Sequence, residues 1–307
     1  MQSASASASA SASASVSARP RALERSRVSL HESSLAHVED AWLPPGWEIP
    51  PLCESAHQII LPYHGFFACS VGDRRCLLDA NWTLCISPQK EYSIHHPLRD
   101  TGDAALIITP SPDTLDEICR TSGSSMSSSF TDPLRRSSML LRLLTQHLLR
   151  LAPEANDPLQ FDECVILALR EAVQSRVSPG RVNRRAAAVE SAKEILHARL
   201  GERISLHDVA REVGVTPVYL TQEFTRQEGS PLYRYFDRLR LSRALVELHH
   251  CENITALALD LGFSTHSHFT AVFRRTFGLT PSEYRSSIGS RDSAMKRLLE
   301  RVGEARA

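Results

Sequence analysis

The pattern of apolar and polar positions changes character along the chain. Residues 57–110 contain short apolar runs of four to eight residues, rich in Ile, Leu, Phe and Tyr, which are separated by Gly-Asp, Asp-Ala-Asn and Ser-Pro turns. This alternation is typical of antiparallel strands in a small barrel or sandwich. Regular structure is therefore expected to begin near His57, with a β domain.

Two leucine-rich segments follow the predicted strands. The leucines of residues 134–151 recur mostly at three- and four-residue steps. Apolar residues over 158–176 show the same spacing after a Pro-rich break. Such spacing places the leucines on one face of an amphipathic helix. That face can serve as simple core packing or as a dimer contact, and the spacing favours neither.

Beyond a Pro-Gly break the remaining elements all carry helix signals. A helix between an N-cap at Ser205 and a stop at Gly214 is followed by a second helix between the N-cap Thr216 and the stop Gly229. Ser205 with Asp208 three residues later is a weaker form of the capping box. Helix, short glycine-containing turn and helix are the plan of a helix-turn-helix unit.

The same plan recurs 48 residues later. Aligning Gly214 with Gly262 superimposes the small and apolar positions of the first helices, and one extra residue in the second turn does so for the second helices. The matched pairs are Leu206–Ile254, Val209–Leu257, Ala210–Ala258, Val213–Leu261, Leu220–Phe269, Phe224–Phe273 and Gly229–Gly278. Two copies of one unit are expected, joined by a long helix over residues 230–250.

Charge separates the two halves of the chain. The 307 residues carry 35 basic and 35 acidic side chains, but residues 1–180 hold 15 and 20 of them, and residues 181–307 hold 20 and 15. The C-terminal half is therefore the expected partner of a polyanion. The seven cysteines include no CxxC pair and suggest reduced thiols in a cytoplasmic protein. With no run of about 18 apolar residues, no membrane partner is expected.

Residues 185–286, about a third of the chain, resemble the DNA-binding domain of the AraC/XylS transcription regulators. The second unit carries the more specific match, because these positions fall on the family signature together: Ala258, Gly262, Phe263, Phe269, Phe273, Phe277, Gly278, Pro281 and Tyr284. The resemblance implies two recognition helices in successive major grooves on one face of double-stranded DNA. Strand pattern and domain order also make residues 57–110 similar to the family's cupin-like effector-binding and dimerisation domain.

The expected fold class is α+β. It comprises an N-terminal cupin-like antiparallel β-barrel with two flanking helices, and an all-α DNA-binding domain of two helix-turn-helix units joined by a long helix. The expected boundaries are a disordered Ser/Ala-rich and Pro-rich tail over 1–46, a sensory and dimerisation domain over 47–177, a linker over 178–184, the DNA-binding domain over 185–288 and a C-terminal tail over 289–307.

The outward positions of the two recognition helices are the candidate DNA contacts. They are Thr216, Val218, Thr221, Gln222 and Arg226 in the first unit, and His266, Ser267, Thr270, Ala271 and Arg274 in the second. Gln222 can pair with adenine through two hydrogen bonds, Val218 can contact a thymine methyl, and Arg226 can reach guanine or phosphate. The helix N-terminus at Thr216 can receive a phosphate oxygen. The rival interpretation of each is plain solvated surface.

Two features of the second recognition helix limit what it can do. Ala271 occupies a position where the family often has Arg, so this helix is expected to discriminate bases less than the first. His266 and His268 suggest a metal clip, but residues two apart on a helix point about 200° away from each other. They therefore cannot chelate one metal ion together.

The effector site is the least determined feature. His64, Phe66, Trp82 and His95 are candidates to line a pocket in the β domain, although such residues are more often core. No metal or cofactor is expected, because the usual HxH with a following Glu of metal-binding cupins is missing. Cysteines in the same strands are a thiol sensor or, by default, buried structural residues.

The function expected from these features is that of a DNA-binding transcription regulator, not an enzyme. Double-stranded DNA is the expected partner, together with a small-molecule effector, RNA polymerase and a second copy of the chain in a homodimer. The alternative is a cupin-type metalloenzyme or a DNA-modifying enzyme that carries an AraC-like DNA-binding unit.

Overall fold

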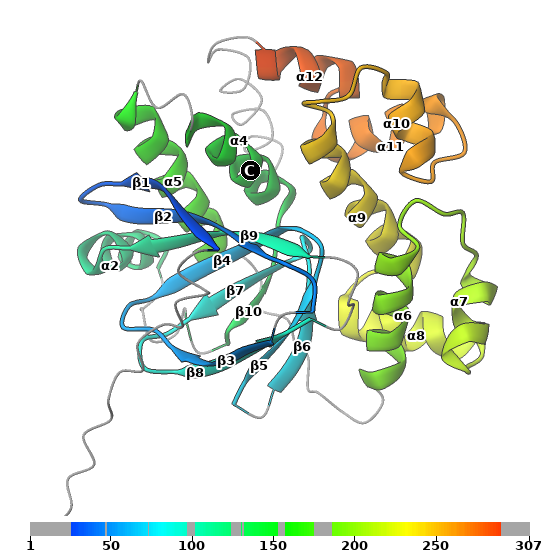
Figure 1. The fold of residues 1–307 in the computed structure, drawn as a ribbon, viewed down its shortest axis with the longest axis horizontal. Coiled ribbons are helices and arrows are strands. Elements are labelled where there is room, and N and C mark those ends of the chain that lie inside the picture. The colour runs from blue at the N-terminus through cyan, green and yellow to red at the C-terminus, as the bar shows by residue number, and fades with distance from the viewer. Residues whose placement is uncertain are drawn as a thin grey trace, which may run out of the picture.

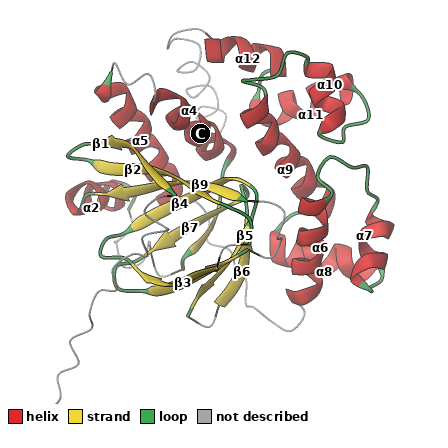
Figure 2. Cartoon of the chain, viewed as in Figure 1, coloured by secondary structure: helices red, strands yellow, loops and turns green. Residues whose placement is uncertain are grey.

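The computed structural model describes residues 26–46, 48–72, 74–96, 102–123, 130, 132–152, 157–174 and 186–289. In the described residues, an antiparallel β domain with three helices forms the N-terminal half, and seven helices of the C-terminal half lie along one side of it (Figure 1). Sheets and helices thus segregate along the chain, as an α+β fold requires (Figure 2). The predicted linker and the C-terminal tail from residue 290 onward lie outside the described residues.

Two antiparallel sheets build the β domain. The larger sheet has the strand order β1-β2-β9-β4-β7-β10, and the smaller has β3-β8-β5-β6. Their bounds are β1 Arg27–Glu32, β2 Ala36–Leu43, β3 Glu48–Cys53, β4 Gln58–His64, β5 Phe67–Val71, β6 Arg74–Leu78, β7 Trp82–Ile86, β8 Glu91–His95, β9 Asp103–Pro110 and β10 Leu134–Arg136.

The larger sheet is buried on both faces, which explains its continuous apolar runs. Ile60 and Ile107 point into the core between the two sheets, whereas their neighbours Ile59 and Ile108 join a cluster with the helices on the opposite face. Those helices are α2 Pro112–Thr121, α4 Met139–Leu151 and α5 Pro158–Gln174. The leucine face of α4 is therefore core.

Two expectations for the N-terminal half were wrong, and one helix there was not predicted. Regular structure begins at Arg27, not near His57, because β1 and β2 fall inside the predicted tail. Strand β2 buries Ala36, Val38, Ala41 and Leu43 and leaves His37, Glu39, Asp40 and Trp42 more exposed, a pattern that the neighbouring prolines obscured. Residues 134–136 form strand β10 and not the start of a helix, and α2 was not predicted.

The described residues of the C-terminal half form helices, as predicted, although the helix over residues 281–289 was not predicted. The helices are α6 Ala186–Ala198, α7 Leu206–Val213, α8 Pro217–Glu228, α9 Leu232–Glu247, α10 Ile254–Asp260, α11 His266–Phe277 and α12 Pro281–Gly289. The pairs α7–α8 and α10–α11 are the two helix-turn-helix units, and α9 connects them (Figure 1). In the described ranges, no helix combines the length and apolar character that crossing a bilayer requires.

Local chemistry places the ends of these helices. Ser205 and Asp208 form a complete capping box at the start of α7, and the Thr216 side chain accepts a hydrogen bond from the backbone N–H of Tyr219 at the start of α8. Gly214 and Gly229 end the two helices in the left-handed region, with φ of 77° and 63°. A side chain is unfavourable in that region, so these positions suit glycine.

Candidate nucleic-acid interface

The first recognition helix, α8, buries one face and exposes the other. Leu220 and Phe224 are fully buried against α6, α7 and α9. Val218 is 67% exposed, and Thr216, Thr221, Gln222 and Arg226 are exposed as well. The structure therefore brings all five predicted contacts of the first unit to one solvent-facing surface.

The polar side chains on this surface differ in the hydrogen bonds and ion pairs that they form within the protein. Gln222 has no hydrogen-bond partner among the described residues. Thr221 donates its hydroxyl to the carbonyl oxygen of Pro217 at 2.8 Å. Arg226 pairs with the nearly buried carboxylate of Glu223, and this partner raises the pKa of Arg226. Glu223 thereby restrains the guanidinium of Arg226, which the sequence pattern did not predict.

The predicted contacts on the second recognition helix, α11, are less exposed to solvent than those on α8. Ser267, Ala271 and Arg274 are exposed, whereas His266 and Thr270 are half-buried. The His266 ring lies within hydrogen-bonding distance of Thr255 Oγ1, at 3.4 Å, and of Thr270 Oγ1, at 3.3 Å. The five predicted contacts of the second unit line an open hollow together with Arg275 and Thr280.

An aromatic stack holds α11 in place. Phe273 is fully buried and lies 5.6 Å from Phe269 and 4.6 Å from Phe277, between ring centroids. The Phe263 ring packs 5.5 Å from the ring of His268. His268 and His266 have separate contacts, and in the described residues no group of three or more His, Cys, Asp or Glu side chains could hold a metal ion.

The four effector candidates do not gather in one place. His64 and Phe66 line a cavity of about 90 Å³ between the β domain and helices α6 and α9. Trp82 is buried in the core between the sheets, beneath the guanidinium of Arg136, and His95 is exposed at the end of β8. The expectation that all four residues line one pocket is therefore wrong.

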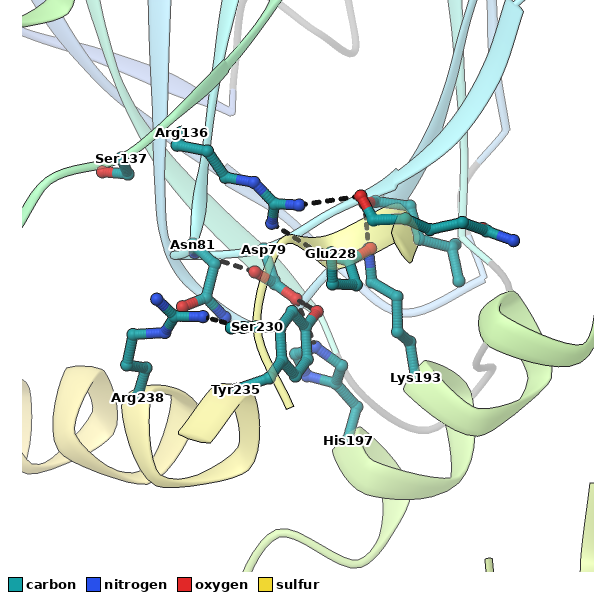
Figure 3. A network of polar contacts seen from close by, with 12 residues as sticks. Asp79, Asn81, Arg136, Ser137, Lys193, His197, Glu228, Ser230, Tyr235 and Arg238 are labelled. Atoms are coloured by element: carbon teal, nitrogen blue, oxygen red, sulfur yellow. Dashed lines mark hydrogen bonds and ion pairs between the residues drawn. The ribbon is translucent and has the colours of Figure 1, made fainter. Parts of the chain in front are cut away.

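A buried network of polar contacts, which we call the domain seam, joins the β domain to the DNA-binding domain (Figure 3). Its residues are Asp79, Asn81, Trp82, Arg136 and Arg142 from the β domain, and Lys193, His197, Glu228, Tyr235, Arg238 and Ser242 from the DNA-binding domain. Arg136 binds Glu228 at 2.7 Å, and Lys193 binds the same carboxylate at 3.1 Å. Lys193 also donates to the carbonyl oxygen of Leu77 in β6 at 2.8 Å.

Asp79 lies at the centre of this seam. Its carboxylate is fully buried, accepts a hydrogen bond from the backbone N–H of Asn81 at 2.7 Å, and contacts His197 Nε2 at 3.1 Å and the Tyr235 hydroxyl. Burial alone would raise the pKa of Asp79, but the His197 hydrogen bond and the Lys193 charge lower it. Asp79 is therefore ionised wherever the two domains are docked at neutral pH.

Sequence reasoning missed the seam for a specific reason. Its members come from six helices and strands and from the turn between β6 and β7, which no local pattern connects. One signal was available, because Lys193 lies four residues after Val189 on the face of α6 that buries Val189, Ala192 and Leu196. A charged residue on an apolar face marks a buried partner.

Two helix-turn-helix units, α7–α8 and α10–α11, each expose one face of their second helix, and helix α9 joins them. This arrangement defines a protein of the double helix-turn-helix class. A helix-turn-helix domain model matches residues 209–287. Regulatory protein SoxS of Salmonella typhimurium is 33% identical over 101 residues, which cover 33% of this chain and 94% of SoxS. The chain belongs to the AraC/XylS family.

Other relatives share the same region. Regulatory protein PocR of Salmonella typhimurium is 34% identical over 101 residues, 33% of each chain. The crystal structure of an AraC-type transcriptional regulator from Chromobacterium violaceum is 30% identical, with a TM-score of 0.32, over 34% of this chain and 94% of that chain. The match spans about a third of the length of the first curated relatives.

Proposed function

We propose that the chain is a sequence-specific, DNA-binding transcription regulator whose two recognition helices, α8 and α11, enter successive major grooves. The observation that carries the proposal is the exposed N-terminal half of α8, where Val218, Thr221 and Gln222 face solvent. An apolar, a hydroxyl and a carboxamide group on one exposed helix face match what base edges in a major groove offer.

The contacts divide into two kinds. The base-reading groups are Val218, Thr221 and Gln222 of α8 and His266, Ser267, Thr270 and Ala271 of α11. Arg274 and the helix N-terminus at Thr216 hold phosphates. Family membership and the net positive charge of residues 181–307 support this division. Because the relatives SoxS and PocR come from bacteria, where DNA lies in the cytoplasm, the cytoplasm is the proposed location, and RNA polymerase at the promoter is the proposed target of regulation.

The β domain is proposed to be a cupin-like sensory and dimerisation domain. Two antiparallel sheets with a shared apolar core support this role, and α5 exposes Leu159 and Leu167, which are 76% and 43% accessible. Exposed leucines on one helix suit contact with a second copy of the chain. Sedimentation equilibrium of the full chain should then report a dimer.

The experiment that tests DNA recognition is capture of genomic fragments by the full chain, followed by affinity measurements on the recovered duplexes. Recovered fragments should bind at least a thousandfold more tightly than random duplex at the same salt concentration, as specific sites typically do. Equal affinity for recovered and random fragments would contradict sequence-specific recognition.

A further inference from the structure

The C-terminal end of the first recognition helix, α8, is held by a residue of the β domain. Arg136 of β10 donates from one terminal nitrogen to the Glu228 carboxylate at 2.7 Å (Figure 3). Its other terminal nitrogen donates to the backbone carbonyl oxygen of Gln227 at 2.9 Å. Both acceptors belong to the last turn of α8, so one guanidinium binds the side chain and the backbone of the same helix end.

The sequence of α8 explains why this end takes a donor from elsewhere in the chain. In an α-helix the carbonyl of residue 227 accepts a hydrogen bond from the backbone N–H of residue 231. Residue 231 is a proline, which has no N–H. The C-terminal end of a helix also carries partial negative charge, which a cation stabilises. Arg136 supplies both the donor and the charge from 91 positions away.

The surroundings of Arg136 fix the position of its guanidinium. Arg136 ends strand β10 and lies opposite Trp82 of β7 in the larger sheet. The guanidinium carbon lies 3.6 Å from the centroid of a Trp82 ring, a cation–π contact that orients the group. Only 24% of the Arg136 side chain is accessible to solvent. The larger sheet therefore determines where the end of α8 lies.

The segment beside this contact is the joint between α8 and the connecting helix α9. The joint comprises Gly229, Ser230 and Pro231. Gly229 has a φ of 63°, and a Cβ added to it would lie 3.9 Å from Arg136 Nη2. The Ser230 hydroxyl accepts a hydrogen bond from Arg238 of α9. Arg136 thus acts at the point where the angle between α8 and α9 is set.

The loop of the first helix-turn-helix unit is fixed to the second unit instead. Arg203, in the loop between α6 and α7, donates to the carbonyl oxygen of Ser264 at 3.1 Å, just before α11. Arg240 of α9 donates to the carbonyl oxygen of Leu200 in the same loop, also at 3.1 Å. The first unit is therefore held at two points, and without Arg136 it would be freer to pivot about the other one.

The contact with Arg136 leaves the DNA-reading surface open. Val218, Thr221 and Gln222 lie in the N-terminal half of α8 and are exposed while the two domains are docked. Arg136 contacts only the last turn of the same helix. DNA can therefore bind α8 without breaking the contact, which then orients the helix on the DNA.

We propose that Arg136 is a positioning residue for DNA recognition. From the β domain it sets the orientation of α8 relative to α11, and hence the spacing of the two blocks of bases that the chain prefers. The inference rests on the proposed recognition of DNA by two helices. A contact that preorganises the two helices favours the one spacing that fits them. One base pair more or less shifts the blocks by about 3.4 Å and turns them by about 35°.

Binding of the full chain to duplexes of altered spacing tests the proposal. The starting duplex is the one that the wild-type chain selects from a random library, and its variants carry one base pair more or less between the two blocks. Fluorescence anisotropy gives the affinity for each duplex. Arg136→Gln should reduce the penalty for altered spacing by about 2- to 30-fold, the range expected of a contact remote from the ligand. The reduction should come mainly from weaker binding of the selected duplex, because the preorganisation is lost.

Three comparisons separate positioning from a general loss of structure. Arg136→Lys keeps a positive charge beside Glu228 but loses the planar fork, so its spacing penalty should lie between those of wild type and Arg136→Gln. Arg170→Gln, at an exposed position on α5, should keep the wild-type penalty. A duplex that retains only the block read by α8 should bind wild type and Arg136→Gln equally. Circular dichroism verifies folding, and Arg136→Lys decides the test if Arg136→Gln is unfolded.

An unchanged spacing penalty, or tighter binding of the selected duplex after substitution of Arg136, would overturn the positioning role. Equal losses on the selected duplex and on the single-block duplex would also overturn it, because they would show damage to α8 itself. A wild-type chain whose binding does not depend on spacing would instead refute the proposed recognition by two helices.

Discussion

Substitution of Gln222 by Ala is the sharpest test of which helix face reads DNA. Gln222 is exposed on α8, and its carboxamide holds no hydrogen bond to described residues, so nothing in the protein has to be broken before it meets a base. A side chain with two hydrogen bonds to one base contributes about 1–3 kcal/mol of discrimination. That range corresponds to roughly 5- to 140-fold in affinity.

The loss should be confined to a single base pair. Thr221 already donates to Pro217, and Arg226 is held by Glu223, so their own contributions are smaller and remain unchanged in the Gln222→Ala variant. Preference at one base pair should fall by roughly 5- to 140-fold. Preferences at the other base pairs and the salt dependence of binding should be retained.

Fluorescence anisotropy with the preferred duplex and each of its single-base-pair variants measures this profile. Gln174→Ala is the matched control, because Gln174 is an exposed glutamine at the end of α5 in the β domain. A Gln222→Ala profile identical to that of the control would show that the assigned reading face is wrong.

Three further predictions concern charge, backbone and pH. Arg274→Ala should weaken binding to all duplexes and reduce the slope of log affinity against log salt by about 0.9, measured by anisotropy from 50 to 200 mM salt; a sequence-dependent loss would contradict a phosphate contact. Gly262 and Gly278 both have positive φ, but a Cβ on Gly262 would lie 2.6 Å from Arg240 Nη2, whereas Gly278 faces open space. Gly278→Ala should therefore lower the unfolding free energy by about 1–2 kcal/mol and Gly262→Ala by more, and equal losses in urea titrations would refute the packing. The pKa of Asp79 is lowered in the folded protein, so Asp79→Asn should lower the unfolding free energy by about 3–5 kcal/mol at pH 7. In urea titrations this difference from wild type should shrink as pH falls below about 4, where the carboxylate becomes protonated. A difference that stays constant with pH would contradict the buried charge.

The C-terminal half could be predicted from the sequence because local rules determine it. Helix caps and stops act over a few residues, as at Ser205, Thr216 and Gly214. The second helix-turn-helix unit repeats the buried positions of the first, so the sequence shows them twice. The N-terminal half was harder, because β1 lies at the edge of the sheet and exposes Val28. Its strand character depends on pairing with β2, which no short window shows.

The candidate sites divide in the same way. The exposure of Gln222 and Val218 followed from helical periodicity, since their buried neighbours on α8 are spaced at four residues. The pairing of Arg226 with Glu223 is also local, at three residues, yet periodicity alone did not show that Glu223 is nearly buried. Contacts across the seam join residues up to 156 positions apart, such as Asp79 and Tyr235, and only the folded chain reveals them.

Selection of bound duplexes from a random library by the full chain tests the central claim most directly. Two recognition helices in successive major grooves should enrich two blocks of preferred bases about one helical turn, roughly 10 base pairs, apart. The block read by α8 should be the more constrained one, because α11 carries Ala271 among its exposed positions. No enrichment over the starting library, or a single block, would contradict DNA reading by two helix-turn-helix units.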